Sequence, residues 1–115
     1  MIVADTSYIV EAILRDASLL EDETILTPDL TLYETVNVLW KHETLMGDLK
    51  GSSVYLGLVL ELISTGTIQL VRPDEKLLTD AYTLSTKHRT SIYDTVFIAL
   101  ALVRLSAREK MKESR

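Results

Sequence analysis

The sequence predicts an α/β fold, a small domain in which helices flank a central parallel sheet. Short apolar runs of strand length alternate along the chain with longer segments of helical periodicity, the order typical of a parallel sheet. The 115 residues are 47% hydrophobic and 25% charged, which suffices for one buried core and excludes a disordered chain. Cysteine is absent, so disulfides, thiolate zinc sites and cysteine nucleophiles are excluded.

The first strand is predicted at residues 2–4, an apolar run that ends at Asp5. Thr6 or Ser7 is expected to cap the helix that follows, because a hydroxyl can accept a hydrogen bond from a free amide of the first turn. The buried side of that helix is predicted to carry Ile9, Ala12 and Ile13.

The second strand is predicted at residues 24–27 and is expected to stop at Pro28, which cannot donate a hydrogen bond to a sheet. A long helix is predicted over residues 31–46, ending at Gly47 and Asp48. The apolar face of this helix is expected to comprise Leu32, Val36, Leu39 and Trp40.

The helix predicted over residues 54–64 is apolar on almost every side, with Glu61 as its only charge. A helix of this kind must be buried on every side, yet in so small a domain this one is peripheral. Its extra apolar surface therefore predicts a homodimer, with burial in the chain's own core as the alternative.

The remaining predicted elements are a third strand and two helices. The strand covers residues 68–71, and Pro73 and Asp74 open the helix that follows. The last helix begins at Ser91 and is nearly fully apolar. This order completes the alternation of strands and helices on which the fold class rests.

Hydropathy and charge narrow the classes of function. The opening residues lack the basic stretch and long apolar run of a signal peptide, and the longest apolar run, residues 96–103, is far too short to cross a bilayer. A cytoplasmic protein without a membrane partner is expected. The net charge of −5 argues against a general nucleic-acid-binding surface, although metal ions in a carboxylate pocket would still attract RNA.

Three acidic residues fall where predicted segments begin or end at one edge of the sheet. Asp5 closes the first strand, and Glu34 and Asp94 lie in the first turns of helices. Taken singly, Asp5 is interpreted as a helix N-cap, and the other two as the acids of capping boxes that start at Thr31 and Ser91. Taken jointly, they would repel one another at this edge unless a cation intervenes. A set of carboxylates suits a hard cation such as Mg²⁺ or Mn²⁺, which predicts metal-dependent phosphodiester chemistry.

Three stretches carry a resemblance to a known family. They are Ile2-Val3-Ala4-Asp5-Thr6-Ser7, then Glu34 with Asn37 one turn on, and finally Ser91-Ile92-Tyr93-Asp94-Thr95-Val96-Phe97-Ile98-Ala99-Leu100-Ala101. These stretches resemble a PIN domain of the VapC toxin type, and the resemblance covers most of the chain. The last stretch is the most specific, since Tyr-Asp followed by a small residue and an Ala-Leu-Ala run recurs in that family.

The resemblance implies a Mg²⁺- or Mn²⁺-dependent endoribonuclease, usually the toxin of a toxin–antitoxin pair whose partner is an antitoxin protein. It implies hydrolysis of RNA phosphodiester bonds to a 5′-phosphate and a 3′-hydroxyl. Carried over residue by residue, Asp5, Glu34 and Asp94 are the metal ligands and catalytic residues. Thr6 or Ser7 would orient Asp5 or touch a phosphate, and Asn37 would line the substrate pocket.

The sequence departs from the family pattern after the last helix. Members of the family continue into a short strand that bears a fourth acid, whereas residues 102–110 show no strand pattern. We therefore expect a PIN-like domain at residues 1–105, C-terminally truncated with its last strand missing, and a charged tail at residues 106–115. The alternative function is a catalytically inactive PIN-like binding module, a truncated toxin that acts through protein partners.

Two other α/β classes fit the sequence less well. A phosphotransferase of the haloacid dehalogenase type needs a second aspartate two residues after the first, but that position is Ser7. A receiver domain needs an acidic pair and a lysine that the chain does not offer at matching places.

Overall fold

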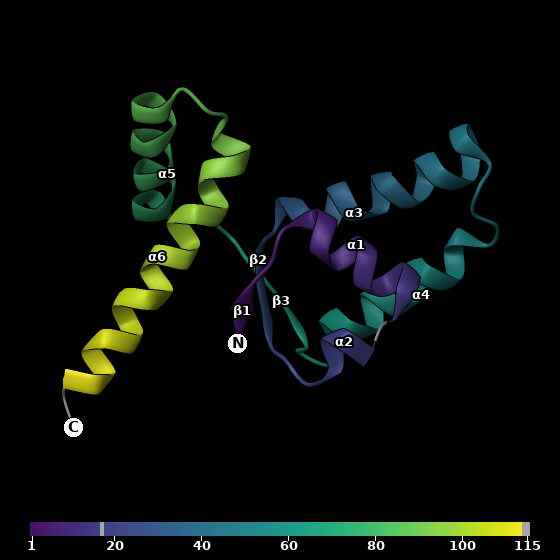
Figure 1. The fold of residues 1–115 in the computed structure, drawn as a ribbon, viewed down its shortest axis with the longest axis horizontal. Coiled ribbons are helices and arrows are strands. Elements are labelled where there is room, and N and C mark those ends of the chain that lie inside the picture. Colours follow the sequence, from purple (N-terminus) through teal and green to yellow (C-terminus); the bar gives the residue numbers. More distant parts are fainter. Residues whose placement is uncertain (17, 114–115) are drawn as a thin grey trace. The chain divides into compact units, whose positions relative to one another are not determined.

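The computed structural model of the protein describes residues 1–16 and 18–113 and confirms the predicted α/β class (Figure 1). The chain divides into two compact units, Met1–Val71 and Arg72–Arg115. The first unit contains the sheet with its helices, and the described residues of the second unit form two helices.

The described residues of the first unit form three strands, four α-helices and one π-helical turn. Its strands are β1 (Ile2–Val3), β2 (Ile25–Pro28) and β3 (Ile68–Val71). Its helices are α1 (Thr6–Arg15), α2 (Ser18–Glu21), α3 (Leu30–Lys41), the π-helical turn η1 (His42–Met46) and α4 (Ser52–Ser64).

The three strands form a parallel sheet in the order β1-β2-β3, as the sequence predicted. Ile25 of the central strand pairs with Ile2 on one side and with Ile68 on the other. Because side chains alternate along a strand, Thr27 points to the same face as Ile25, one row nearer the carboxyl ends of the strands. That row lies directly before the residues that start α1 and α3.

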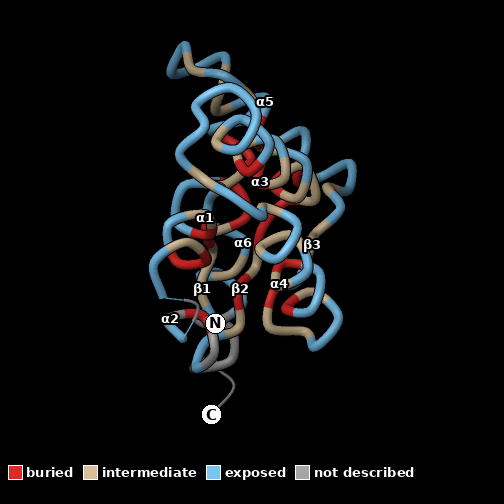
Figure 2. The backbone as a smooth tube through the Cα atoms, turned by 90° about the vertical axis from the view of Figure 1, so that its right-hand side faces the viewer, coloured by how far each residue is buried: buried red, intermediate tan, exposed pale blue. Residues whose placement is uncertain are grey.

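The core of the first unit lies between the sheet and helices α1, α3 and α4, which contact one another. Figure 2 shows buried stretches along β2 and on the inner sides of these helices. The buried residues of this core are Ala4, Ile9, Ala12, Ile13, Leu20, Ile25, Val59, Leu62 and Ile68. The predicted buried side of α1 is thereby confirmed.

The start of α1 differs from the prediction in one detail. Asp5 is the N-cap, and its Oδ1 accepts a hydrogen bond of 2.9 Å from the Tyr8 backbone amide. Thr6 and Ser7 are instead the first two residues of the helix, so the prediction that one of them caps it is wrong. The carboxylate reaches the free amide from one residue earlier, which leaves the Thr6 hydroxyl available for another partner.

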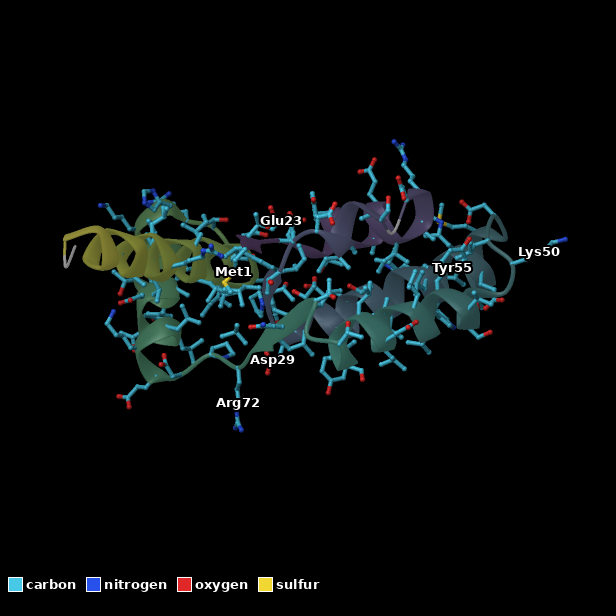
Figure 3. All side chains as sticks on the ribbon, turned by 90° about the horizontal axis from the view of Figure 1, so that it is seen from below. Met1, Glu23, Asp29, Lys50, Tyr55 and Arg72 are labelled. Carbon is cyan, nitrogen blue, oxygen red and sulfur yellow. The ribbon has the colours of Figure 1, made fainter. Side chains whose placement is uncertain are left out.

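The segment after β1 and α1 holds two further differences. The short helix α2 was not predicted, because four residues are too few to display a helical period. Pro28 is the last residue of β2 and does not stop the strand before itself. Asp29 lies at the junction of β2 and α3, and its side chain makes no capping bond among the described residues (Figure 3).

Helix α3 presents threonines to the core where an apolar face was predicted. Of the predicted face only Leu39 is buried, and Trp40 is 48% exposed. Thr31 and Thr35 occupy the buried side with it. The observed buried face of α3 is therefore rotated about the helix axis by part of a turn from the predicted one. The hydrophobicity of the residues alone did not reveal this rotation.

The helix predicted over residues 31–46 is divided into α3 and the π-turn η1. The segment ends at Gly47, as predicted, with a φ of 66° that favours glycine. Lys50 projects outward from the connection that leads to α4 (Figure 3). Within η1, Glu43 accepts hydrogen bonds from the Gly51 amide at 3.1 Å and the Ser52 amide at 3.4 Å, and so caps α4.

Helix α4 starts two residues earlier than predicted and is only partly buried. Val59 and Leu62 are its buried residues, while Val54 and Leu60 are exposed. The predicted surplus of apolar surface on this helix is therefore present in the structure of the single chain.

The second unit is a helical hairpin made of α5 (Glu75–His88) and α6 (Ile92–Glu113). Asp74 caps α5 by accepting a 2.8 Å hydrogen bond from the Leu77 amide, which confirms the predicted start. The two helices pack together, and the buried Thr95 hydroxyl donates to the Ala81 carbonyl oxygen at 2.8 Å. Helix α6 continues past the predicted boundary between residues 105 and 106. Within the described ranges, no helix is long and apolar enough to cross a membrane.

Candidate functional site

Two of the three predicted acids lie in the first unit, at the carboxyl end of the sheet. Asp5 follows β1 directly, and Glu34 lies in the second turn of α3, which follows β2. The sheet is parallel, so both helices start at the same edge. The fold therefore places both acids where the sequence predicted them relative to their strands.

A hydrogen bond connects the segments that carry these two acids. The Thr6 hydroxyl donates to Glu34 Oε1 at 3.1 Å, across 28 positions of sequence, and the pair is partly buried. Thr6 is the residue next to Asp5, so this bond joins the start of α1 to α3. Thr6, predicted to orient Asp5 or touch a phosphate, is thus found to contact Glu34.

The contact with Thr6 replaces the capping box predicted for Glu34. Helix α3 begins at Leu30, one residue before Thr31, so Thr31 is inside the helix and cannot be its N-cap. The Glu34 side chain turns to Thr6 and makes no bond to the start of its own helix among the described residues. The structural interpretation of Glu34 as a capping-box acid is therefore wrong.

Each of the two acids keeps one carboxylate oxygen free of described donors. Asp5 uses Oδ1 for the Tyr8 amide, and Glu34 uses Oε1 for Thr6. Among the described residues, no donor reaches Asp5 Oδ2 or Glu34 Oε2, and no ion pair involves either side chain. Two carboxylates with uncommitted oxygens are a donor set that fits a hard divalent cation.

Buried hydroxyls also connect the segments at this edge of the sheet. Thr27 Oγ1 lies 2.8 Å from the Ala4 carbonyl oxygen and 2.8 Å from Thr31 Oγ1. A hydroxyl carries one hydrogen and a carbonyl can only accept, so Thr27 donates to Ala4 and accepts from Thr31. Sequence reasoning did not predict this bonded pair, because a threonine in a strand or helix carries no signal of burial or of its partner.

The third predicted acid, Asp94, lies in the first turn of α6 in the second unit. Its Oδ2 accepts hydrogen bonds from Ser91 Oγ at 3.2 Å and Thr90 Oγ1 at 3.5 Å. Its backbone amide donates to Ser91 Oγ at 3.4 Å. The bond from the Asp94 amide to the Ser91 hydroxyl is the one that the predicted capping box requires of its serine. The Asp94 carboxylate, however, contacts the Ser91 hydroxyl and not the Ser91 backbone amide.

The segment before Asp94 is fixed by Ser85 near the end of α5. The Ser85 carbonyl oxygen accepts from the Arg89 and Thr90 amides, and the Ser85 hydroxyl donates to the Thr90 carbonyl oxygen. Arg89 adopts the left-handed conformation at φ 51°, which closes the helix. These bonds hold Thr90, whose hydroxyl is one of the two that contact Asp94.

The remaining predicted residues are on the surface. Ser7 and Asn37 are exposed, and neither side chain forms a hydrogen bond with another described residue. Asn37 lies one turn after Glu34 on α3, which places it on the same side of the helix. Their predicted contact with substrate stays a prediction.

The three acids do not form a metal-binding group in the parts of the chain that the structure describes. No cluster of three or more Asp, Glu or His side chains with that arrangement occurs among those residues. Asp5 and Glu34 belong to the first unit and Asp94 belongs to the second. The three-acid site therefore stays a prediction.

The comparison with known families agrees with this architecture. The PIN domain family profile matches residues 2–107, which is most of the chain. A search of curated proteins found no significant match. PIN domains are generally nucleases, and typically metal-dependent ones. The parallel sheet, the acids at its carboxyl end and the match over residues 2–107 together show that the chain belongs to the PIN domain family.

Proposed function

We propose that this PIN domain is a Mg²⁺- or Mn²⁺-dependent endoribonuclease. The observation that carries the proposal is the arrangement of Asp5, Thr6 and Glu34. The Thr6 hydroxyl ties Glu34 to the segment that carries Asp5 at the carboxyl end of the sheet, and each acid keeps one oxygen uncommitted among the described residues. Asp94 is proposed to complete the ligand set.

The chain's own side chains would divide the work as follows. Asp5, Glu34 and Asp94 hold the cation, and Thr6 fixes the orientation of Glu34 through its 3.1 Å bond. Ser7 and Asn37 contact the RNA backbone. The bound cation supplies an acidified water and positive charge beside the phosphate. Hydrolysis at this site would add water to phosphorus and break its bond to the 3′-oxygen, which would take up a proton, and so would leave a 5′-phosphate and a 3′-hydroxyl.

In this proposal RNA binding requires the cation, because the protein carries a net negative charge. At a net charge of −5 the chain would repel a polyanion, and the acids add to the repulsion locally. Cations in the site reverse the sign of the local charge. We therefore propose that RNA binding and cleavage share one metal requirement.

The test is cleavage of labelled single-stranded RNA by the purified protein with Mn²⁺ or with a chelator. Asp94→Asn is expected to lose metal-dependent cleavage without unfolding, because the amide keeps the size of the carboxylate and removes its charge. The matched control is Asp80→Asn, an aspartate of the same unit whose side chain is 46% exposed and whose ion pair with Lys76 contributes little.

Three outcomes decide this proposal. Cleavage that requires both Mn²⁺ and Asp94 supports it. Equal cleavage by Asp94→Asn and wild type contradicts the assigned role of Asp94. Absence of cleavage by folded wild type contradicts the nuclease proposal and favours the inactive binding module.

We further propose that the protein is the toxin of a toxin–antitoxin pair and acts in the cytoplasm on cellular RNA. The support is the sequence resemblance to the VapC type and the exposed apolar side chains of α3 and η1, which a partner protein would cover. They are Tyr33, Trp40, Leu45 and Met46. Growth arrest on expression of wild type but not of Asp94→Asn would support toxicity, and growth unaffected by either would contradict it.

A homodimer is proposed from the exposed part of α4. Val54 and Leu60 are exposed on this helix, whose buried residues are Val59 and Leu62. A second copy that packs against this face would bury them. Val54 is 73% exposed and Leu60 is 50% exposed in the single chain, so both side chains are open to a partner.

A further inference from the structure

We propose that Thr27 is a positioning residue for the acidic site, because its hydroxyl fixes the segment that carries Asp5 relative to the helix that carries Glu34. The inference rests on the proposed function and names a residue that touches neither RNA nor metal. Thr27 lies on the central strand, is fully buried and belongs to no part of the predicted site.

The first link runs from Thr27 to the start of α1. The hydroxyl donates to the Ala4 carbonyl oxygen at 2.8 Å, and this carbonyl belongs to the peptide that leads directly into Asp5. Ala4 is itself buried, at 5% exposure, and its bond with Thr27 lies in the core, where a backbone carbonyl needs a partner within the protein. Loss of the hydroxyl would leave a buried acceptor without this donor, and the peptide before Asp5 would turn to find another.

The second link runs from Thr27 to α3. The Thr31 hydroxyl donates to Thr27 at 2.8 Å from the first turn of that helix, three residues before Glu34. The chain of bonds from Ala4 through Thr27 to Thr31 therefore spans the same two segments that Thr6 and Glu34 join near the surface. One bond lies in the core and the other near solvent, and together they define the spacing of the two acids.

A matched control is available on the same helix. Thr35 is also buried, at 1% exposure, and its hydroxyl has no partner among the described residues. It borders the same small cavity as Thr27 and Thr31. Valine has nearly the shape of threonine and lacks only the hydroxyl. Thr27→Val therefore removes hydrogen bonds, whereas Thr35→Val removes a hydroxyl that has no partner among the described residues.

The experiment measures Mn²⁺ affinity directly, from the paramagnetic resonance signal of free Mn²⁺ titrated into the full chain without RNA. Thr27→Val is expected to bind Mn²⁺ about tenfold more weakly than wild type, or weaker still, the range typical of lost support to a metal ligand. Thr35→Val is expected to stay within about twofold, since it breaks no bond to either segment. Thr27→Ser keeps the hydroxyl and is expected to restore most of the affinity.

The controls separate positioning from stability and from the proposed function. Circular dichroism shows whether each variant is folded at the temperature of the titration. Should Thr27→Val not fold, Thr31→Val replaces it, because it breaks only the link to α3 and is expected to weaken binding severalfold.

Each outcome has a definite meaning. Wild-type affinity in the folded Thr27→Val or Thr31→Val protein overturns the positioning role, as does an equal loss in Thr35→Val. Absence of Mn²⁺ binding by wild type overturns the proposed function itself, and this inference with it.

Discussion

At the scale of single residues, the candidate site depends on hydroxyl groups as much as on carboxylates. Thr6 donates to Glu34 Oε1, and Ser91 donates to Asp94 Oδ2. A carboxylate on a flexible side chain has several rotamers, and a hydrogen bond from a fixed donor selects one of them. A cation then binds oxygens that are already in place, so less conformational entropy is lost on binding.

Thr6→Val tests this role at the acid of α3. The substitution removes the donor to Glu34 while it keeps the shape of the side chain, and we expect a loss of about 1 kcal/mol in the free energy of unfolding. We also expect Mn²⁺ affinity to fall by about tenfold. Urea unfolding and Mn²⁺ titration measure the two effects.

Ser7→Ala is the control for Thr6→Val. Ser7 is exposed, follows Thr6 directly and makes no side-chain bond to another described residue. Its removal is expected to change the free energy of unfolding by less than about 0.5 kcal/mol and to leave Mn²⁺ affinity unchanged. A Thr6→Val protein indistinguishable from Ser7→Ala would contradict the role of Thr6.

At the scale of elements, the junction between η1 and α4 holds the clearest electrostatic feature of the chain. The N-cap of α4 is Gly51, which has no side chain, so Glu43 supplies the acceptor for the first amides of that helix. The Ser52 hydroxyl, followed by the Ser52 amide, lowers the pKa of the Glu43 carboxyl below its ordinary value. These bonds favour the charged form, because a protonated carboxyl accepts more weakly.

The lowered pKa of Glu43 makes one contribution to stability dependent on pH. Its folded-state pKa lies below the unfolded one, so the contribution is present above the ordinary value of about 4.5 and is lost as the pH falls through the folded-state pKa. Glu43→Gln is expected to be less stable than wild type at pH 7 and to lose less stability below pH 4.5. Urea unfolding at both pH values measures this.

Glu61→Gln is the control for Glu43→Gln. Glu61 is an exposed acid on α4, the helix that Glu43 caps, and its side chain makes no hydrogen bond with another described residue. Its replacement is expected to leave the pH dependence as in wild type. Parallel pH profiles for wild type and Glu43→Gln would contradict the capping role.

Elements that a local sequence pattern determines were predicted well. Features that depend on a contact with another part of the chain were predicted poorly. The strand at Ile68–Val71 has the predicted bounds, since an apolar run between turn residues is a local signal. The π-turn at His42–Met46 has no such signal, because its residues continue the helical pattern of α3. The buried side of α3 was misplaced for a similar reason, since Thr31 is paired through a hydroxyl whose partner lies on β2.

At the scale of the whole molecule, the proposed site draws on both compact units. Asp5 and Glu34 come from Met1–Val71, and Asp94 comes from Arg72–Arg115. The sequence located Asp5 at the end of its strand and Asp94 in the first turn of its helix, because both are local features, whereas Glu34 lies in the second turn of α3 and not in the predicted first turn. Their assembly into one metal site is a long-range property, and the proposal of it comes from the family resemblance.

The proposed dimer is a second property of the whole molecule. Leu60→Glu puts a charge on the exposed face of α4 and is expected to convert a dimer into single chains, because a charge in an apolar interface is costly to desolvate. Leu78→Glu on α5 is the control, since Leu78 is 48% exposed and Leu60 is 50% exposed. Light scattering measures the masses. A wild-type mass of one chain, or a dimer that survives Leu60→Glu, would contradict the α4 interface.

The most direct test of the central claim is a Mn²⁺ titration of wild type beside Asp94→Asn, with Asp80→Asn as the control. If Asp94 shares one cation with Asp5 and Glu34, its loss should weaken Mn²⁺ binding by about tenfold or more, while Asp80→Asn should bind as wild type does. Equal Mn²⁺ affinity in wild type and a folded Asp94→Asn would contradict a single metal site built from the three acids.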